Sequence, residues 1–319
     1  MTIGILGGGV WGSALAKLFS DQEVLIYTRD KKVMNSINDH HFNPKLKYAT
    51  FNENVKATDD LESITKKSLI FIALPTQSIR EVLSKSYFQN LNADVIIASK
   101  GIEISSSLFL SQLVENLIKP KSLSILSGPC FSDEVAQDLP TAATFASSNS
   151  SIFDLISGML KTKKFRIYYS DDVIGCQIGG ALKNIIAIGV GICYGLKYGN
   201  NTVATFITSG FNEMIKLGLA CGALEKTFLG FSGLGDLITT CSSSLSRNRY
   251  VGEQLAIGKS IFDIKKSMSN VAEGVDTIFA AQNLSELHNL DLPIINGIYN
   301  IVFNDESPDY VIKNLTNSI

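Results

Sequence analysis

Two lysines and one aspartate are the residues of this sequence best suited to proton-transfer chemistry. Lys100 directly follows an apolar run that ends at Ser99, and Lys183 lies in a helix-like stretch of glycine, alanine and isoleucine. A lysine removed from water near a second cation has a lowered pKa, so it can protonate a forming alkoxide. Asp236 presents an acid on a glycine-rich turn. Two alternatives stay open: Lys100 as an exposed loop residue, and Lys183 as a residue whose ammonium reaches water.

A second group, Ser246, Arg247 and Asn248, is suited to binding a phosphate. The three residues supply a hydroxyl, a forked guanidinium and an amide in consecutive positions. Arginine binds phosphate through two parallel hydrogen bonds, which makes this group a candidate anion site. The same residues also fit a helix cap with exposed charges, and the sequence alone leaves that alternative open.

A glycine-rich turn near the amino terminus has the pattern G-x-G-x-x-G, formed by Gly7, Gly9 and Gly12. It directly follows a candidate strand and precedes a candidate helix, so the glycines allow a tight turn, close approach of a pyrophosphate, and close packing of helix on strand. The pattern predicts a dinucleotide site rather than a merely flexible turn.

The end of the next strand bears on the choice of cofactor. Thr28 stands where an acid usually binds the ribose 2′-hydroxyl, and Arg29 follows it. An arginine there pairs with a 2′-phosphate or stacks on adenine, which favours NADP(H) over NAD(H). The alternative is that Arg29 is a solvated charge while Asp30 serves NAD.

The elements that must position these residues fall into two kinds. In the first half, short β-rich runs alternate with segments of helical period, which predicts an α/β domain with a parallel sheet. From Asp171 onward, long apolar helical segments predict an all-helical domain. We expect a Rossmann-type dinucleotide-binding domain at 1–169 and a helical substrate-binding and catalytic domain at 170–319. The expected strands are 2–6, 23–27, 69–73, 95–99, 122–126 and 165–169.

Composition excludes several other classes of protein. With 28 Lys and Arg against 30 Asp and Glu, no field of one sign attracts nucleic acid or an anionic membrane. The five cysteines form no C-x-x-C pair, so neither a metal site nor a disulfide framework is expected, and a reducing cytoplasm is the simplest setting. The amino terminus lacks the basic start of a signal peptide. The longest apolar tract, 185–196, is too short to span a bilayer and is expected to be a buried helix, so no membrane insertion is expected.

Taken together, these stretches resemble the NAD(P)-dependent glycerol-3-phosphate dehydrogenases of the soluble bacterial type. The matching segments occur in the family's order with compatible spacing and cover nearly the whole chain. They are GGGVWGSALA at 7–16, ALPTQSIR at 73–80, KGIE at 100–103, SGPCFSDEVA at 127–136, GGALKN at 179–184, GLGDLITTCSSSLSRN at 233–248 and VAEGV at 271–275.

The resemblance implies an oxidoreductase that reduces dihydroxyacetone phosphate to sn-glycerol 3-phosphate, reversibly, for phospholipid biosynthesis. It also implies a homodimer. Lys183 matches the family's proton donor, Lys100 a lysine that contacts substrate and cofactor, and Asp236 the acid that orients the catalytic lysine. The resemblance further places Gly128, Cys130, Ser246, Arg247 and Asn248 at the substrate. Positions lining the cofactor are Gly7, Gly9, Val10, Trp11, Gly12, Arg29, Lys100, Ser132, Arg247, Val271 and Glu273.

Several positions depart from the family's pattern. Cys130 stands where the family usually has serine, so a strong hydroxyl donor becomes a weak thiol donor. Gln177 stands where glutamate is common, and Val203 and Ser209 stand where basic residues are common. None of these departures touches Lys100, Lys183, Asp236 or Arg247, so activity is expected to survive, with kinetic constants and cofactor preference open.

Two competing functions fit parts of the sequence. A 6-phosphogluconate or ketopantoate reductase would share the architecture, but segments 179–184 and 246–248 argue against that acceptor. A nucleotide-binding sensor without catalysis would be expected to lose the pair of lysine and acid, which is present.

Overall fold

The structure is a computed structural model that describes residues 1–268 and 272–317, without the side chain of Asn317. Its chain forms two compact units. We call them the sheet unit, made of Met1–Ser99 and Leu110–Val173, and the helical unit, made of Lys100–Phe109 and Ile174–Ile319. Val271, one of the residues expected at the cofactor, lies outside the described residues. The division at 169 and 170 stays a prediction.

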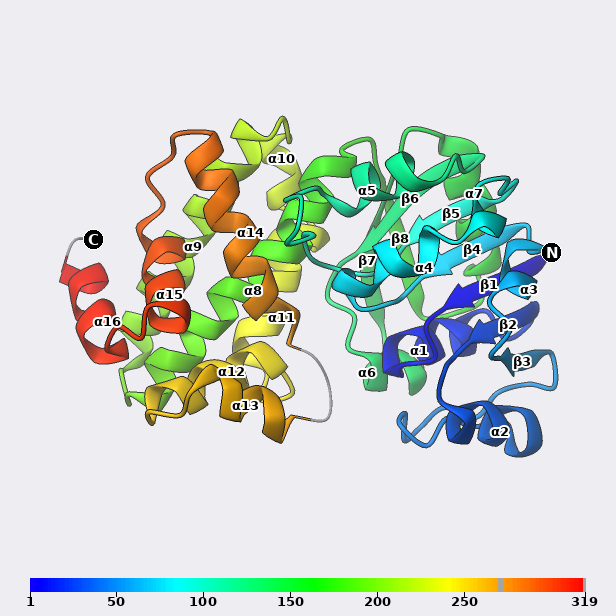
Figure 1. Cartoon of the computed structure of the whole chain (residues 1–319), viewed down its shortest axis with the longest axis horizontal. Coiled ribbons are helices and arrows are strands. Elements are labelled where there is room, and N and C mark those ends of the chain that lie inside the picture. Colours follow the sequence, from blue (N-terminus) through cyan, green and yellow to red (C-terminus); the bar gives the residue numbers. More distant parts are fainter. Residues whose placement is uncertain (269–271, 318–319) are drawn as a thin grey trace. The chain divides into compact units, whose positions relative to one another are not determined.

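The sheet unit is built on one eight-stranded sheet in the order β3-β2-β1-β4-β5-β6-β7-β8 (Figure 1). All neighbouring strands are parallel except β6 and β7, which pair antiparallel. This order, with β1 beside β4 at the reversal, is typical of dinucleotide-binding folds. The strands are β1 (Thr2–Leu6), β2 (Glu23–Tyr27), β3 (Val55–Thr58), β4 (Leu69–Ile72), β5 (Asp94–Ile97), β6 (Ser122–Ser127), β7 (Thr141–Ser147) and β8 (Phe165–Ser170).

The predicted α/β class is confirmed, and the sheet has two features that the sequence did not predict. The strands β3 and β7 were not predicted, because VKAT is short and TAATFAS consists largely of alanine and small polar residues, which are weak strand signals. The predicted parallel sheet is confirmed, and it contains one antiparallel pair, β6 with β7, in which Ser124 pairs with Ser147 and Ser127 with Thr144. Hydrophobic pattern alone does not specify strand direction.

Helices cover both faces of this sheet. All four residues of β4 are buried, and because successive side chains of a strand point to opposite faces, neither face of β4 is open to water. The helix α1 packs against α6. The helices of the sheet unit are α1 (Val10–Leu18), α2 (Lys31–His40), α3 (Glu62–Thr65), α4 (Ile79–Leu83), α5 (Leu110–Leu117), α6 (Ser132–Ala136) and α7 (Ser150–Met159).

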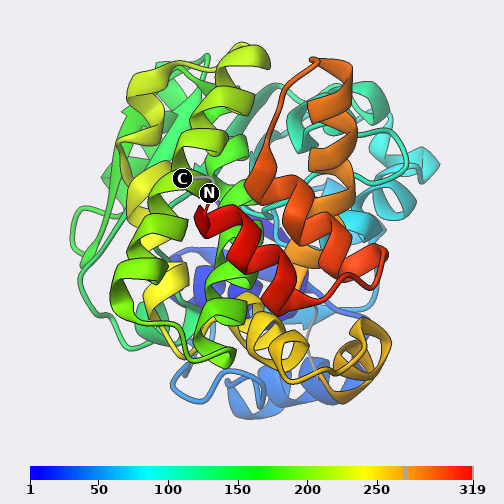
Figure 2. The same ribbon diagram turned by 90° about the vertical axis from the view of Figure 1, so that its left-hand side faces the viewer.

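The helical unit is arranged around α8 (Val173–Gly195), whose residues from Gly175 to Cys193 are all buried. Its described part contains no strand of the sheet, as the sequence predicted. The later helices α14, α15 and α16 pack in succession against one another (Figure 2). Besides α8 the unit has α9 (Asn200–Ala220), α10 (Glu225–Phe228), α11 (Asp236–Ser242), α12 (Arg247–Ala256), α13 (Ile261–Ser267), α14 (Glu273–Leu287), α15 (Pro293–Phe303) and α16 (Pro308–Asn317).

The apolar tract of α8 is longer than the sequence predicted. The helix has 23 residues, so by length and composition it could cross a membrane, but 89% of its most apolar window is buried inside the protein. Glycines allow this burial, because a Cβ on Gly191 would lie 2.0 Å from the carbonyl oxygen of Arg249 in α12. The helix is thus a core helix packed backbone against backbone, and its packing partners are the elements of the site.

Candidate active site

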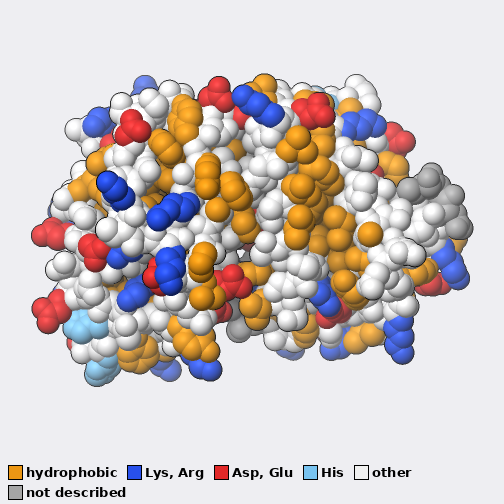
Figure 3. Space-filling model, turned by 180° about the vertical axis from the view of Figure 1, so that it is seen from behind, with side chains coloured by type: hydrophobic (Ala, Val, Ile, Leu, Met, Phe, Trp, Pro, Cys, Tyr) orange, Lys and Arg blue, Asp and Glu red, His pale blue; other side chains and the backbone are white. Residues whose placement is uncertain are grey.

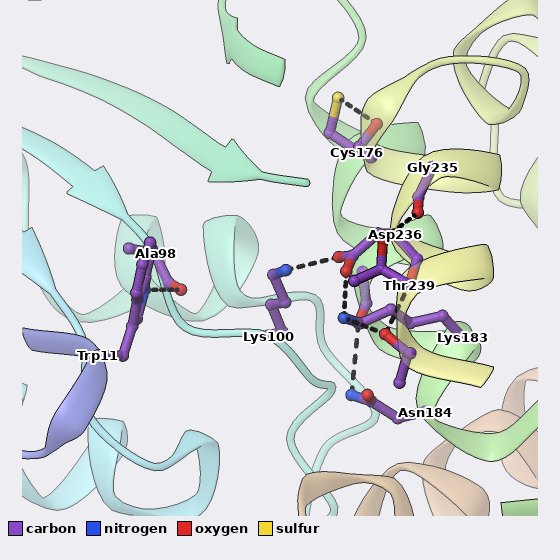
Figure 4. A network of polar contacts seen from close by, with 12 residues as sticks. Trp11, Ala98, Lys100, Cys176, Lys183, Asn184, Gly235, Asp236 and Thr239 are labelled. Carbon is purple, nitrogen blue, oxygen red and sulfur yellow. Dashed lines mark hydrogen bonds and ion pairs between the residues drawn. The ribbon is translucent and has the colours of Figure 1, made fainter. Parts of the chain in front are cut away.

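Two lysines and a buried carboxylate meet within the helical unit. The Nζ of Lys100 lies 2.5 Å from Oδ2 of Asp236, and the Nζ of Lys183 donates to Oδ1 of the same carboxylate. The two ammonium groups thus point at one acid from different segments (Figure 4). The side chain of Asp236 is 2% exposed and that of Lys183 9%, while that of Lys100 is 20% exposed. The structure therefore brings together the three residues that the sequence singled out for proton transfer.

Close packing of α8 places Lys183 beside this acid. A Cβ on Gly179 would lie 2.4 Å from the carbonyl oxygen of Ser232, so only glycine lets α8 approach the π-helical segment Phe231–Gly235. Lys183 stands four residues after Gly179, hence on the same face of the helix. Asp236 is the first residue of α11 rather than part of a turn, directly after the π-helical segment. A π-helical turn of this kind is often found at functional sites.

Thr240 provides a second acceptor for Lys183. The Nζ of Lys183 donates to Oγ1 of Thr240 at 2.9 Å, and that hydroxyl donates its proton to the carbonyl oxygen of Asp236 at 2.6 Å. Because the hydroxyl has one proton and uses it on the carbonyl, it can only accept from the lysine. The sequence did not single out Thr240 for this role, although its spacing of four residues from Asp236 in a helix is the signal that points to it.

The charges of this centre suit a substrate that gains negative charge on oxygen. Two ammonium groups and one carboxylate leave one positive charge in excess, and the burial of Asp236 and Lys183 lowers the local dielectric. A positive charge held in place in such surroundings stabilises a developing oxyanion more than it would in water. An ammonium with protons directed to fixed acceptors is also positioned to act as a general acid.

The three residues expected to bind a phosphate lie at the start of α12. Ser246 is the N-cap of this helix and accepts from the N–H of Arg249 at 3.3 Å, so the alternative reading of a helix cap holds for this residue. Arg247 is exposed, whereas Asn248 is buried. The surrounding protein removes water from the guanidinium of Arg247, and this desolvation lowers its pKa below the usual value. The negative charge of Glu273 opposes that change. Arg247 and Glu273, both expected at the cofactor, therefore lie within electrostatic reach of each other.

The glycine-rich turn between β1 and α1 has the geometry that the sequence predicted. Gly7 has φ of +122°, and a Cβ there would lie 2.5 Å from the carbonyl oxygen of Ala73. A Cβ on Gly12 would lie 1.9 Å from the carbonyl oxygen of Gly7. The turn and the contact of helix with strand therefore exclude any side chain at these two positions.

Gly9 is different, because a Cβ there would meet no atom within 4 Å. The fold itself does not require glycine at this position, but the close approach of a pyrophosphate to the start of α1 would. Asn43, which lies outside the turn in the sequence, connects the turn to α1. Its Nδ2 donates to the carbonyl oxygen of Gly8 at 3.1 Å and to Oγ of Ser13 at 2.6 Å. Nothing in the sequence marked Asn43, since its partners lie 30 and 35 residues away.

At the end of β2, Arg29 is followed by an acid, Asp30, whose carboxylate is engaged by other groups. Asp30 accepts from the N–H groups of Lys32 and Val33 as the N-cap of α2, and it pairs with Lys45 at 2.7 Å. The hydrogen bond with Lys45 is the main cause that lowers the pKa of Asp30. Arg29 is exposed and forms no ion pair among the described residues.

The other site residues predicted for the sheet unit lie after the carboxyl ends of strands or at the first residues of helices. Trp11 donates from Nε1 to the carbonyl oxygen of Ala98 at 3.0 Å, which ties the start of α1 to the end of β5. Gly128 has φ of +158° and directly follows β6. Cys130 is half-buried and is not part of a disulfide. Ser132 begins α6, which packs against α1, and Val10 begins α1.

A Rossmann-type sheet with a glycine-rich first turn, followed by a helical unit that holds a buried lysine against an acid, defines the class of nicotinamide-dependent oxidoreductases. The amino-terminal model of NAD-dependent glycerol-3-phosphate dehydrogenase matches residues 2–153, and the carboxy-terminal model of the same family matches residues 172–313. The chain belongs to the NAD-dependent glycerol-3-phosphate dehydrogenase family.

Known proteins agree with this family along the whole chain. The chain is 39% identical over 302 residues to "Glycerol-3-phosphate dehydrogenase [NAD(P)+]" of Zymomonas mobilis, covering 94% of this chain and 88% of that protein. It is similar to the crystal structure of glycerol-3-phosphate dehydrogenase from Coxiella burnetii, with 31% identity, a TM-score of 0.93, and coverage of 99% and 98%. A probable 2-dehydropantoate 2-reductase from Bacillus subtilis shares the fold alone, at 14% identity, a TM-score of 0.58, and coverage of 98% and 100%. These findings confirm the family that the sequence resembles.

Proposed function

We propose that this protein catalyses the reversible, NAD(P)H-dependent reduction of dihydroxyacetone phosphate to sn-glycerol 3-phosphate, which supplies glycerophospholipid synthesis. The observation that carries the proposal is the shared carboxylate of Asp236, which holds Lys100 and Lys183 in one buried centre. Family membership supports the substrate, because the relative from Zymomonas mobilis has the same activity in its name.

The proposed mechanism assigns one task to each side chain. Lys183 protonates the C2 oxygen of the ketone in reduction and accepts that proton in the reverse reaction. Asp236 and Thr240 hold the ammonium of Lys183 in place, while Lys100 stabilises the negative charge on the same oxygen. When bound, the nicotinamide cofactor supplies the hydride for C2.

The phosphate of the substrate is assigned to the start of α12. Arg247 supplies a guanidinium, and Ser246 and Asn248 flank it in the sequence. The loop that contains Gly128 and Cys130 is assigned a further contact with the substrate. A cysteine at this position donates a weaker hydrogen bond than serine would, so the affinity for the triose is expected to be lower.

We assign the cofactor to the sheet unit and favour NADP(H). The turn at Gly7, Gly9 and Gly12 would hold the pyrophosphate, with Val10 and Trp11 beside it. Arg29 supports a 2′-phosphate because the acid that follows it, Asp30, already caps α2 and pairs with Lys45. Ser132, Arg247, Glu273 and Val271 complete the proposed cofactor contacts. The proposed domains remain 1–169 for the cofactor and 170–319 for the substrate and catalysis.

We further propose a homodimer in the cytoplasm. Large apolar side chains are exposed in the helical unit at Leu229, Ile238 and Leu245, and association with a second copy would remove such surface from water. Figure 3 shows one face, on which apolar side chains gather and both signs of charge are interspersed. Sedimentation equilibrium at micromolar concentration tests the dimer, and a mass of 34.6 kDa would contradict it.

The decisive experiment mixes the purified protein with dihydroxyacetone phosphate and either NADPH or NADH, and follows the cofactor absorbance. We expect oxidation of the cofactor, faster with NADPH. Lys183→Ala is expected to abolish turnover and leave NADPH binding nearly intact, because this lysine acts on the substrate oxygen. Arg247→Ala is expected chiefly to raise KM for the phosphorylated ketone.

Two results would contradict the proposal. Failure of the wild-type protein to oxidise either cofactor would remove the reaction, and oxidation only with ketopantoate would favour the reductase alternative. Full turnover in Lys183→Ala would remove the assigned proton donor.

A further inference from the structure

A buried asparagine holds the glycine-rich turn through its side-chain amide. Asn43 lies in the loop between α2 and β3 and is 0% exposed. Its Nδ2 donates to the carbonyl oxygen of Gly8 at 3.1 Å and to Oγ of Ser13 at 2.6 Å, while its Oδ1 accepts from the N–H of Lys45 at 2.9 Å. One side chain thus connects the turn, the first half of α1 and its own loop.

The direction of this amide is fixed by the backbone of its own loop. An N–H group can only donate, so Oδ1 must be the atom that faces Lys45, and Nδ2 must face the turn. Both hydrogens of Nδ2 are then used within the protein, and an amide oxygen cannot donate to an anion. Full burial also keeps the side chain away from any bound ligand. Asn43 can therefore act on a cofactor only through the turn.

The loop that carries Asn43 is anchored independently of the turn. Phe42 and Thr50 form an antiparallel bridge, and the hydroxyl of Ser36 in α2 donates to the carbonyl oxygen of Phe42 at 2.9 Å. Leu46 is 1% exposed and belongs to the hydrophobic core of the sheet unit. These contacts give Asn43 a fixed position from which to hold the turn.

The hydrogen bond to Gly8 fixes the plane of the peptide between Gly8 and Gly9. In a trans peptide the C=O and the following N–H point in opposite directions, so a carbonyl of Gly8 held by Asn43 turns the N–H of Gly9 away from that side. On the side of β2, a Cβ on Gly8 would lie 2.5 Å from Cβ of Thr28, so the peptide is closely packed there as well. Gly9 is the N-cap of α1 and has no side chain to accept from the first N–H groups of the helix. Such N–H groups attract a pyrophosphate, whereas a carbonyl oxygen turned toward it would repel it.

We infer that Asn43 is a positioning residue for the cofactor, because it holds the carbonyl of Gly8 so that the N–H groups at the start of α1 stay directed at the pyrophosphate. The inference rests on the proposed function, since it takes the turn as the site of the pyrophosphate. Its structural test needs neither substrate nor cofactor, so the inference and the proposed reaction can fail separately.

The structural test measures amide hydrogen exchange of the peptide with residues 7–13 in the free protein, by mass spectrometry. Asn43→Asp keeps an oxygen for the N–H of Lys45 with little change of shape, but a carboxylate cannot donate to the carbonyl oxygen of Gly8. We expect faster deuterium uptake in Asn43→Asp than in the wild type, because the turn is no longer held in one plane. Equal uptake in the two proteins would overturn the inference.

The binding test measures the Kd of NADP+ by isothermal titration calorimetry. Asn43→Leu removes the donor without adding a charge, and Asn43→Asp removes it while adding one. Both are expected to raise Kd roughly ten- to hundredfold, which is the effect of losing a well-oriented hydrogen bond to a charged group. If only Asn43→Asp raised Kd, repulsion by its carboxylate would be the cause and the inference would be wrong.

Two further variants separate the hydrogen bond to Gly8 from its surroundings. Asn38→Asp is the matched control for the charge, because the side chain of Asn38 also donates to a carbonyl oxygen and accepts from an N–H, in both cases of Ala57 in β3, at 3.0 and 2.8 Å. Ser13→Ala removes the second acceptor of Asn43 and leaves the carbonyl of Gly8 in place. Both are expected to bind NADP+ with nearly the wild-type Kd. If either raised Kd as much as Asn43→Leu, the bond to Gly8 would not be the cause.

Steady-state kinetics distinguishes a positioning role from a general loss of structure. In Asn43→Leu the KM for NADPH is expected to rise while kcat stays nearly unchanged, because the pyrophosphate takes no part in the transfer of hydride or proton. A merely structural role would lower the fraction of folded enzyme and therefore kcat. A lower kcat with an unchanged KM for NADPH would overturn the inference, whereas an inactive wild type that binds NADP+ would count against the proposed reaction only.

Discussion

At the scale of single residues, the centre depends on one carboxylate that pairs with two ammonium groups. The carboxylate of Asp236 is buried, and a buried charge is tolerated only when it is paired and hydrogen-bonded. Lys100 and Lys183 supply that pairing, and in return Asp236 reduces the repulsion between them. The same acid therefore stabilises the fold locally and determines where the two ammonium groups lie.

Thr240→Val tests how strongly the position of Lys183 matters. Valine has nearly the shape of threonine but cannot accept from Nζ, so Lys183 loses one of its fixed acceptors. A hydrogen bond to a charged group is worth about 1.5–3 kcal/mol, which corresponds to a fall in kcat of roughly ten- to hundredfold. Steady-state kinetics measures this fall in kcat, with Thr205→Val in α9 as the control, because among the described residues the hydroxyl of Thr205 bonds only a carbonyl oxygen of its own helix, that of Asn201. An unchanged kcat would show that Asp236 alone positions the lysine.

Arg29→Ala tests the preference for cofactor. Loss of the guanidinium is expected to lower kcat/KM for NADPH roughly ten- to hundredfold, because only NADPH has the 2′-phosphate. The value of kcat/KM for NADH is expected to stay nearly unchanged. Lys66→Ala removes an exposed cation elsewhere in the sheet unit and serves as the control. If Arg29→Ala affected both cofactors equally, the assignment of the 2′-phosphate to this residue would be wrong.

At the scale of elements, glycine determines which helices can touch. Gly179 admits the π-helical segment before Asp236, Gly191 admits α12, and Gly274 brings the start of α14 onto α8. Because these contacts involve backbone atoms, they leave little freedom for one helix to slide along another. Three segments that are distant in the sequence are thereby held around Lys183.

Two glycines of the first turn separate a structural role from a binding role. Gly12→Ala is expected to lower the free energy of unfolding by about 1–3 kcal/mol, since its Cβ would collide with the carbonyl oxygen of Gly7. Gly9→Ala has room for its Cβ, so it is expected to unfold like the wild type while binding NADPH more weakly. Urea unfolding and fluorescence titration of NADPH measure the two effects. An unchanged free energy of unfolding in Gly12→Ala would contradict the structural role of that glycine. A wild-type affinity for NADPH in Gly9→Ala would contradict the binding role.

At the scale of the whole molecule, a buried acid links two helices and makes stability depend on pH. Glu213 of α9 accepts from the N–H groups of Ile294 and Ile295 at the start of α15, at 2.6 and 3.0 Å. Burial raises the pKa of Glu213 from 4.5 to about 7, with Asp291 adding to the rise and the two N–H groups and Lys216 opposing it. The folded protein therefore holds this proton at pH values where the unfolded chain has lost it.

The sign of the pH effect follows from that difference. The stabilisation of the folded state by protonated Glu213 is fully present below pH 4.5 and is lost as pH rises through about 7. At 1.36 kcal/mol per pKa unit, the loss is at most ~3.4 kcal/mol. Glu213→Gln should be less stable at low pH yet remove this dependence between pH 5 and 8, while the exposed Glu225→Gln should retain it. Thermal melts across that range measure it, and parallel profiles for wild type and Glu213→Gln would contradict the raised pKa.

The sequence by itself determined the fold class, the first turn and the identity of the chemical groups. The strands β1 and β2 have the predicted bounds, because strong apolar runs bounded by polar residues or glycine are local signals. The strands β3 and β7 could not be found in this way, since their residues are stabilised by neighbours in the sheet rather than by their own pattern. The turn at Gly7, Gly9 and Gly12 was predictable because steric limits on the backbone act within a few residues.

Only the tertiary structure decided how those groups combine. Lys183 and Asp236 are 53 positions apart and Lys100 and Asp236 are 136 apart, so no periodicity connects them. The roles of Thr240 and Asn43 likewise depend on which backbones approach one another. Chemistry of this kind needs atoms within hydrogen-bonding distance, and that distance is set by the packing of helices across the unit rather than by the order of residues along the chain.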